Sequence, residues 1–247
     1  MTRRSVSTNE RPIGFSTGSL AKGDFNAALE SLRCSDATAV ELSALRENEL
    51  LPLMQAIPTL NLARFAHVSV HAPSALRAMD ETALGDVLRP ALTARLPVVV
   101  HADILRDFPV WRSFGKLLLI ENMDKRKSSG RTASELRPIL DALPKAKLCL
   151  DLAHARQIDS SLCETVTLLE EFGPRIAQLH ISELDAQSRH ESLSHAAVAA
   201  LRSVSRLIPV DAPVILEFSA SPETLNAHIR LVRSALRAAP ILARSAG

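Results

Sequence analysis

Short apolar runs alternate along this chain with longer segments of helical periodicity, and this alternation constrains the fold more than any other feature. Short, often β-branched apolar runs are typical of buried strands, whereas apolar residues three or four positions apart are typical of helices. Repeated strand and helix units predict a parallel sheet. The expected strands are Ile13–Ser16, Ala39–Leu42, His67–Val70, Val98–Val100, Leu117–Ile120, Lys147–Leu150, Ile176–Leu179 and Pro213–Leu216. The expected helices include Asp24–Leu32, Asn48–Ala56, Ala133–Leu143, Ser160–Phe172, Ala196–Leu207 and Pro222–Ala239.

The number of these units decides between two α/β folds. Eight strands in 247 residues leave about 31 residues per unit, which matches a (β/α)8 barrel. A doubly wound sheet has fewer strands and usually begins with a GxGxxG turn, which Gly14, Gly18 and Gly23 do not form. No linker rich in proline, glycine or serine divides the chain. We therefore predict an α/β fold consisting of a single (β/α)8 TIM barrel over residues 13–247, after a flexible leader at residues 1–12.

Composition excludes several classes of protein. A hydrophobic content of 47% excludes a disordered chain, and no apolar run approaches the roughly 20 residues of a membrane span, so we expect a soluble protein. Lys and Arg number 29 against 27 Asp and Glu, and the net charge of +2 gives no overall attraction for nucleic acid or membrane. Cys34, Cys149 and Cys163 are too few for a disulfide framework, and no signal peptide is evident, so we expect a cytoplasmic location.

Acidic residues and histidines close seven expected strands in succession. In a barrel the carboxyl ends of the strands meet at one mouth, where catalytic groups lie. One such residue is usually structural, but seven together place unpaired carboxylates and imidazoles side by side. A divalent cation resolves this conflict, and mixed nitrogen and oxygen ligands suit zinc, manganese, iron or cobalt. The residues are Glu41, His71, His101, Glu121 (followed by Asn122), Asp151 (with His154 nearby), His180 and Glu217.

Four other histidines fall outside this series. His67 opens the third strand at the opposite end of the barrel, and His195 and His228 fall on helices, so we expect these three to be solvated or capping residues. His190 lies in the loop after the seventh strand, close enough to fold back over the mouth.

Four motifs resemble the xylose isomerase-like TIM-barrel superfamily, which includes sugar isomerases and epimerases and the endonuclease IV group. They are VHAP, IEN, CLDLAH, and the stretch from LHISE to SRHES, and the resemblance covers nearly the whole chain. Each motif is weak alone, but their order and their placement at strand ends agree.

The epimerase branch of this superfamily implies a single metal ion held by Glu121, Asp151, His180 and Glu217. In that branch Glu121 and Glu217 would move protons on opposite faces of a ketose while the metal stabilises the enediolate. His154 or Arg189 would steady the substrate oxygens.

The endonuclease IV branch implies a larger set of ligands for up to three ions. His71, His101 and Glu121 match its first site, and Glu121 also bridges to the set described above. The third site corresponds to His154, His190 and Ser188, where serine replaces the aspartate of the family. We therefore expect one or two ions rather than three, and the replacement puts phosphodiester cleavage in question.

The loop after the fifth strand, MDKRKSSGRT, carries four cations among small residues. Lys125, Arg126 and Arg131 are the candidate phosphate-binding residues, with Lys127 beside them. The alternative is a solvated basic loop.

These observations favour a divalent-metal-dependent isomerase or epimerase, or a related lyase, acting on a small sugar or sugar phosphate. An endonuclease IV-like phosphoesterase acting on damaged DNA is the first alternative. One Trp, no Tyr and 3% aromatic residues leave few side chains that could enter a base stack, so nucleic acid is the less favoured partner. A non-catalytic metal- or ligand-binding barrel is the second alternative.

Overall fold

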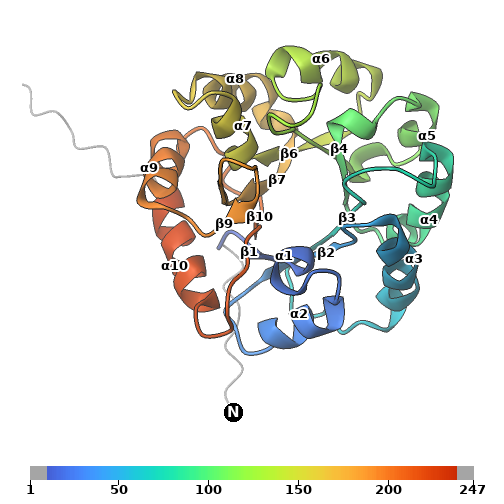
Figure 1. The fold of residues 1–247 in the computed structure, drawn as a ribbon, viewed down its shortest axis with the longest axis horizontal. Coiled ribbons are helices and arrows are strands. Elements are labelled where there is room, and N and C mark those ends of the chain that lie inside the picture. Colours follow the sequence, from blue (N-terminus) through green and yellow to red (C-terminus); the bar gives the residue numbers. More distant parts are fainter. Residues whose placement is uncertain (1–9, 238–247) are drawn as a thin grey trace, which may run out of the picture.

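Residues 10–237 of the computed structural model are described here, and they form a closed α/β barrel (Figure 1). Eight parallel strands follow one another around the barrel in the order β1, β10, β7, β6, β5, β4, β3 and β2, and β2 pairs with β1 to close it. The helices surround the strands on the outside. The predicted single (β/α)8 barrel is confirmed.

All eight predicted apolar runs are strands of this barrel. Most extend one or two residues beyond the predicted ends, because backbone pairing continues through the polar residue that closes the run. The strands are β1 (Ile13–Ser16), β2 (Ala39–Ser43), β3 (His67–His71), β4 (Val98–His101), β5 (Leu118–Glu121), β6 (Lys147–Asp151), β7 (Ile176–Ile181) and β10 (Val214–Leu216). A small antiparallel pair, β8 (Glu183–Leu184) and β9 (His190–Glu191), lies in the connection after β7.

The six predicted helices are also present, and the structure adds four that the sequence analysis did not name. The last predicted helix ends at Leu236, and residues 238 and 239 lie outside the described part. The helices are α1 (Thr17–Ala21), α2 (Phe25–Leu32), α3 (Glu47–Ala56), α4 (Glu81–Thr93), α5 (Phe108–Arg112), α6 (Ala133–Ala142), α7 (Leu152–Ile158), α8 (Cys163–Phe172), α9 (His195–Val204) and α10 (Leu225–Leu236). Short 3-10 turns occur at η1 (Ile57–Thr59), η2 (Ala102–Ile104), η3 (Gly115–Leu117) and η4 (Gly173–Arg175).

Side chains at the N-termini fix where several helices begin. The carboxylates of Asp24 and Asp80 accept hydrogen bonds from the third backbone N–H of α2 and α4, at 2.9 and 2.8 Å. The hydroxyl groups of Thr132 and Ser194 do the same for α6 and α9. These bonds satisfy backbone donors that the helices leave free.

Successive side chains of each strand point alternately toward the surrounding helices and into the barrel, so the protein has two buried regions. Outward residues such as Val40 and Leu42 pack against the helices in the main hydrophobic core. Inside the barrel, Val99, Leu119 and Cys149 form a small buried cluster. Two residues further along β4, β5 and β6, on the same face, lie polar side chains at the carboxyl end.

The expected leader falls mainly on residues 1–9, which lie outside the described part. Arg11 and Pro12 are bound to the barrel: Arg11 donates a hydrogen bond to the carbonyl of Ala212 at 2.7 Å, and the N–H of Val214 donates to that of Pro12 at 2.9 Å. Within residues 10–237, no helix is both long and apolar enough to span a membrane.

Gly14 on β1 marks a close approach between strands. A Cβ atom at this position would lie 1.6 Å from the backbone oxygen of Ala39 on β2, which cannot move without breaking the barrel. We expect Gly14→Ala to lower the free energy of unfolding by about 3 kcal/mol. Gly173→Ala is the matched control, because a Cβ atom added there would meet nothing within 4 Å. Equal Tm values for the two variants in thermal unfolding would contradict this prediction.

Candidate metal centre

Six of the seven predicted strand-end residues converge at one end of the barrel, and the seventh, Glu41, lies next to them but two residues before the end of β2. The parallel register places His101 beside Glu121 and Asp151 beside His180. Glu217 directly follows β10. His101 is half-buried and the others are buried, so these charged and polar groups face one another with little water.

Glu121 lies at the centre of this cluster, and its two carboxylate oxygens face different partners. Oε2 lies 3.0 Å from Nε2 of His71 and 3.3 Å from Nε2 of His101. Oε1 lies 3.0 Å from Nδ1 of His180. That same nitrogen is 3.3 Å from Oε2 of Glu217.

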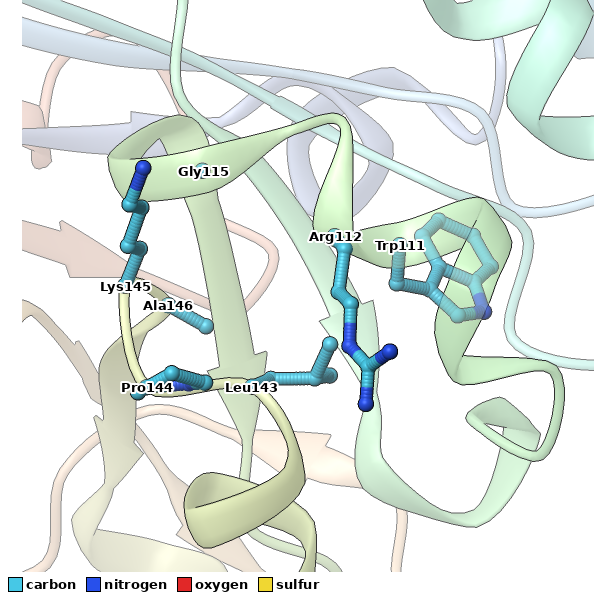
Figure 2. Close-up of a pocket in the computed structure, with 7 residues that line it drawn as sticks. All are labelled: Trp111, Arg112, Gly115, Leu143, Pro144, Lys145 and Ala146. Carbon is cyan, nitrogen blue, oxygen red and sulfur yellow. The ribbon is translucent and has the colours of Figure 1, made fainter.

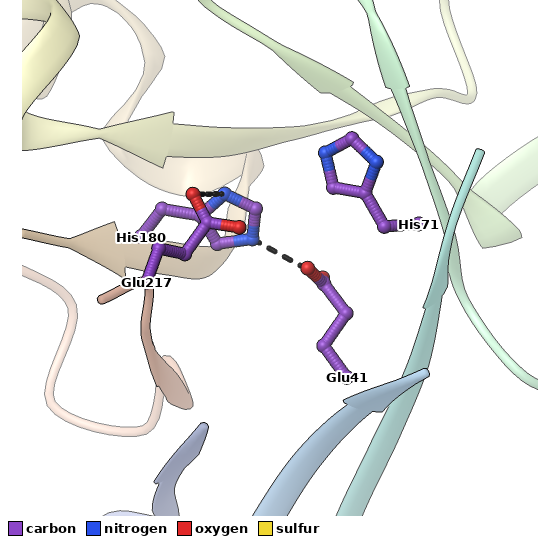
Figure 3. Close-up of side chains that lie close together, drawn as sticks. All are labelled: Glu41, His71, His180 and Glu217. Atoms are coloured by element: carbon purple, nitrogen blue, oxygen red, sulfur yellow. Dashed lines mark hydrogen bonds and ion pairs between the residues drawn. The ribbon is translucent and has the colours of Figure 1, made fainter. Parts of the chain in front are cut away.

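Three groups of residues bring possible ligand atoms within 4.8 Å of one another. Two of them share Glu121. They are His71, His101 and Glu121, and Glu121, Asp151, His180 and Glu217. The third consists of Glu41, His71, His180 and Glu217, whose side chains point toward one another in Figure 3.

Backbone carbonyls fix the orientation of two imidazoles. Nδ1 of His71 donates to the carbonyl of Ala72 at 2.6 Å, and Nδ1 of His154 donates to that of Asn122 at 2.8 Å. A carbonyl only accepts, so Nδ1 carries the proton and Nε2 of the neutral ring carries a lone pair. The lone pair of His71 then faces the carboxylate of Glu121, and a positive charge between them removes the repulsion.

The shifted pKa values of Glu121, His71 and Glu217 show that positive charge stabilises the carboxylates of the cluster. Burial opposes ionisation of Glu121, but His180, His101 and His71 outweigh burial and hold its pKa well below the usual range. Burial would lower the pKa of His71, yet the hydrogen bond with Glu121 and nearby acidic charges raise it to about 9. The pKa of Glu217 falls to about 2, against burial, mainly because of the charge of His180. Protonated imidazoles thus occupy the electrostatic role of a cation.

The pKa values of Asp151 and His101 shift toward the neutral form of each group, unlike those of Glu217 and His71. Burial and the charges of Glu121 and Glu217 raise the pKa of Asp151, although His154 counteracts them. Burial lowers the pKa of His101 despite its contact with Glu121.

Buried atoms without partners test whether a metal fits. Among the described residues, Oδ2 of Asp151, Oε1 of Glu41 and Nδ1 of His101 are buried and have no hydrogen-bond partner. Asp151 is nevertheless held firmly: its N–H and C=O both bond the side-chain amide of Asn122, and Oδ1 accepts from the N–H of His154. The imidazole and carboxylate set therefore fits a divalent cation with nitrogen and oxygen ligands.

The region expected to hold a third ion is less complete. The rings of His154 and His190 lie 5.6 Å apart, and Nδ1 of His190 is 2.8 Å from the hydroxyl of Ser182. In residues 10–237, neither His154 nor His190 belongs to a group of three possible ligands. Ser188 is buried and donates a hydrogen bond to Gln157 at 2.8 Å.

Arg189 is not brought into the cluster. Its side chain is exposed, and its Nε forms an ion pair with Asp185 at 2.6 Å. The role expected for it, holding substrate oxygens, stays a prediction.

The basic loop after β5 offers less positive charge than its sequence indicates. Arg126 forms an ion pair with the neighbouring Asp124, and Arg131 forms one with Glu135 at 2.6 Å. Lys127 reaches Asp103 at 2.7 Å, next to His101. Lys125 is exposed. Phosphate binding by Lys125, Arg126 and Arg131 stays a prediction.

His67 corrects one expectation. Its ring is half-buried rather than solvated, and its Nε2 lies 2.7 Å from Oε1 of Gln178 on β7. Position 67 points into the barrel because it shares the inward face of β3 with His71. His195 is exposed as expected, whereas the ring of His228 packs against Phe218 at 4.9 Å.

The sequence analysis also left three neighbours of the cluster without a role. Glu41 was noted as a strand end but not assigned as a site residue. Gln178 lies below His180, and Asp124 lies 3.9 Å from His154. For Gln178 the available signal was its position, two residues before His180 on the same strand.

Two cavities differ in their relation to the cluster. One of about 220 Å³ is lined by Trp111, Arg112, Gly115 and residues 143–146 (Figure 2). These residues lie just before β5 and β6, so this cavity is at the end of the barrel opposite the cluster. A larger one of about 810 Å³ is lined by the loops that follow β2 and β3, on the side of the cluster. Arg46, Ser74 and Arg77 are among its lining residues.

The model of the xylose isomerase-like TIM barrel family matches residues 102–236. This is more than half of the chain, which therefore belongs to that family. No curated protein matches the chain.

Solved structures agree with this fold. Endonuclease IV from Thermus thermophilus is 20% identical, with a TM-score of 0.60, covering 91% of this chain and 98% of that one. A xylose isomerase domain protein from Alicyclobacillus acidocaldarius is 15% identical, with a TM-score of 0.56, covering 92% and 96%. The 3-keto-D-glucoside 4-epimerase YcjR from E. coli is 12% identical, with a TM-score of 0.53, covering 91% and 100%. At these identities the likeness shows the fold alone.

His71 makes the stability of the metal-free protein depend on pH. Its pKa rises from an ordinary value of 6.5 to about 9 on folding, so its stabilising contribution is complete below pH 6.5 and is lost as the pH rises through 9. We expect the Tm of the chelated protein to fall over this range, and added zinc to reduce the fall by replacing the proton. His71→Gln should flatten the dependence, with the exposed His195→Gln as control. A Tm that rises between pH 6.5 and 9 would count against this assignment.

Proposed function

We propose that this protein is a divalent-metal-dependent phosphoesterase with a two-metal centre, of the endonuclease IV type. The observation that carries the proposal is the position of Glu121, whose two oxygens face His71 and His101 on one side and His180 on the other. A carboxylate placed in this way suits a bridge between two cations. The sequence alone favoured a sugar isomerase or epimerase, but a single-metal epimerase does not need His71 or His101.

Each of the two ligand groups would hold one metal ion. His71 and His101 would bind one ion and Asp151, His180 and Glu217 the other, with Glu121 between them. Bound divalent ions supply Lewis acidity and lower the pKa of a water molecule. The side-chain amide of Asn122 bonds the backbone N–H and C=O of Asp151, which fixes the position of Asp151 before any ligand binds.

Glu217 supplies an ionised carboxylate at the mouth of the centre. Its pKa of about 2 keeps it ionised at neutral pH, which is the state that a ligand of a divalent cation needs. The side chain is slightly exposed, unlike that of Glu121, and is thus more accessible to a substrate. Nδ1 of His190 lies 3.9 Å from Oε2 of Glu217 and is half-buried at the rim.

An anionic substrate fits the surroundings of the site. Arg46 and Arg77 are exposed on the cavity formed by the loops after β2 and β3, on the side of the cluster. Their positive charge is partly balanced, because Arg46 pairs with Glu49 at 3.5 Å and Glu47 also lines the cavity. One guanidinium group can donate two parallel hydrogen bonds to two oxygens of a phosphate. The name of the Thermus protein, an endonuclease, supports a phosphodiester of damaged DNA as the first substrate to test.

A sugar isomerase or epimerase is the second candidate. The group of Glu121, Asp151, His180 and Glu217 is sufficient to hold one ion, and one similar structure is named an epimerase. The two candidates differ in whether His101 is needed.

His101→Gln distinguishes the two functions. For a two-metal phosphoesterase we expect the metal content to fall from about two ions per chain to one, and hydrolysis of DNA with an abasic site to fall about 100-fold. A one-metal isomerase would keep its single ion and its turnover of ketoses. Elemental analysis and both assays decide between them, with His195→Gln as control. A wild-type protein that takes up no added metal would exclude both functions.

Replacing Arg46 and Arg77 by alanine tests the anionic substrate. We expect the KM for a phosphodiester to rise about 10-fold, equivalent to about 1.4 kcal/mol, with little change in kcat. Arg33→Ala at the end of α2 is the control, because this residue is exposed and pairs with Glu30 away from the cavity. An unchanged KM would show that the substrate does not use this cavity.

A further inference from the structure

Glu41 lies one layer deeper in the barrel than the candidate ligands. It pairs with Ser69 on β3, two residues before His71, and it is completely buried. Its Oε2 atom lies 3.1 Å from Nε2 of His180, on the side of the ring opposite the nitrogen that faces Glu217 (Figure 3). The same oxygen accepts hydrogen bonds from Ser69 at 3.0 Å and from Nε2 of Gln178 at 2.6 Å.

The orientation of the Gln178 amide follows from its partners. Its nitrogen must face the carboxylate of Glu41, because a carboxylate only accepts. Its oxygen then accepts a hydrogen bond from Nε2 of His67 at 2.7 Å. Gln178 therefore presents N–H groups, not an acceptor, toward His180.

These contacts define two alternative tautomers of His180. Gln178 and Glu41 both lie near its Nε2, at 2.9 and 3.1 Å. With the proton on Nδ1, Nε2 accepts from Gln178 and its lone pair faces the carboxylate of Glu41. With the proton on Nε2, the ring donates to Glu41, and the second N–H of Gln178 has Sγ of Cys149, at 3.6 Å, as its acceptor. The lone pair of Nδ1 then faces Glu121 and Glu217.

We propose that Glu41 is a positioning residue that holds the proton on Nε2 of His180 and thereby directs Nδ1 to the metal. The inference rests on the proposed metal centre and adds a residue that the centre needs for affinity. Gln178 cannot replace Glu41, since it offers no acceptor to that nitrogen. A carboxylate that accepts the second N–H of a metal-bound imidazole fixes the ring and increases its basicity.

The charge of Glu41 gives the contact its strength. Ser69, Gln178 and His180 are the polar groups that touch this carboxylate in the described residues, and neither Ser69 nor Gln178 carries a charge. An imidazole bound to a cation is a stronger donor than a free one, so a bound metal would strengthen the contact that His180 and Glu41 already make at 3.1 Å. Ser69 and Gln178 hold the carboxylate in place from below, and His67 holds Gln178.

Zinc titration of Glu41→Gln tests this role in the full-length protein. We expect the affinity for zinc to fall about 10- to 100-fold, while the number of ions bound at saturation stays that of the wild type. Glu164→Gln is the matched control, because this half-buried carboxylate on α8 bonds the N–H of Ala133 at 2.6 Å outside the barrel, and the variant should bind zinc like the wild type. An unchanged affinity in Glu41→Gln would overturn the proposal, and the loss of one ion at saturation would instead make Glu41 a ligand.

Nuclear magnetic resonance of the wild type keeps the test decisive if Glu41→Gln does not fold. With cadmium-113 and nitrogen-15 in the histidine rings, we expect coupling between the metal and Nδ1 of His180 and a proton on Nε2. Coupling to Nε2 of His180 would overturn the role of Glu41. A wild-type protein that binds neither zinc nor cadmium would overturn the metal centre itself, which separates that failure from failure of the positioning role.

Discussion

Mutual compensation of charge at one end of the barrel is the constraint on which the site depends. Glu41, Glu121 and Asp151 are almost completely buried, and Glu217 nearly so. Isolated carboxylates in such surroundings would be strongly destabilising. Imidazoles on neighbouring strands reduce this cost, and the raised pKa of His71 and lowered pKa of Glu217 express the compensation. A cation performs the same task with ligands that need no extra proton.

The barrel produces this concentration of charge through its register. In a parallel barrel, inward side chains form layers, and the layer at the carboxyl end brings together residues from several strands. Asp151 meets His180 and His101 meets Glu121 through direct backbone pairing. The layer below contains Glu41, Ser69 and Gln178, so the polar character of the mouth extends into the barrel interior.

Sequence reasoning predicted the strands and the converging residues well, because both follow from local patterns. An apolar run and the residue that ends it lie within a few positions of each other in the sequence. Once the strands form a closed barrel, their carboxyl ends must meet at one mouth. Contacts between loops were not accessible in this way. The pairing of Lys127 with Asp103 depends on how loops approach one another, and the pairing of Arg189 with Asp185 on a tight turn. His67 was misjudged because its strand was known, but the partner across the barrel, Gln178, was not.

The order of the candidate ligands along the chain determines when each ligand group can form during synthesis. His71, His101 and Glu121 come from the adjacent strands β3, β4 and β5, so a ribosome delivers them in one uninterrupted stretch. Glu217 is delivered almost one hundred residues later than Glu121, after the last strand. The second ligand group is therefore complete only when β10 has joined β1 and β7. A nascent or truncated chain that lacks β10 would hold only the first of the two ligand groups of the proposed centre.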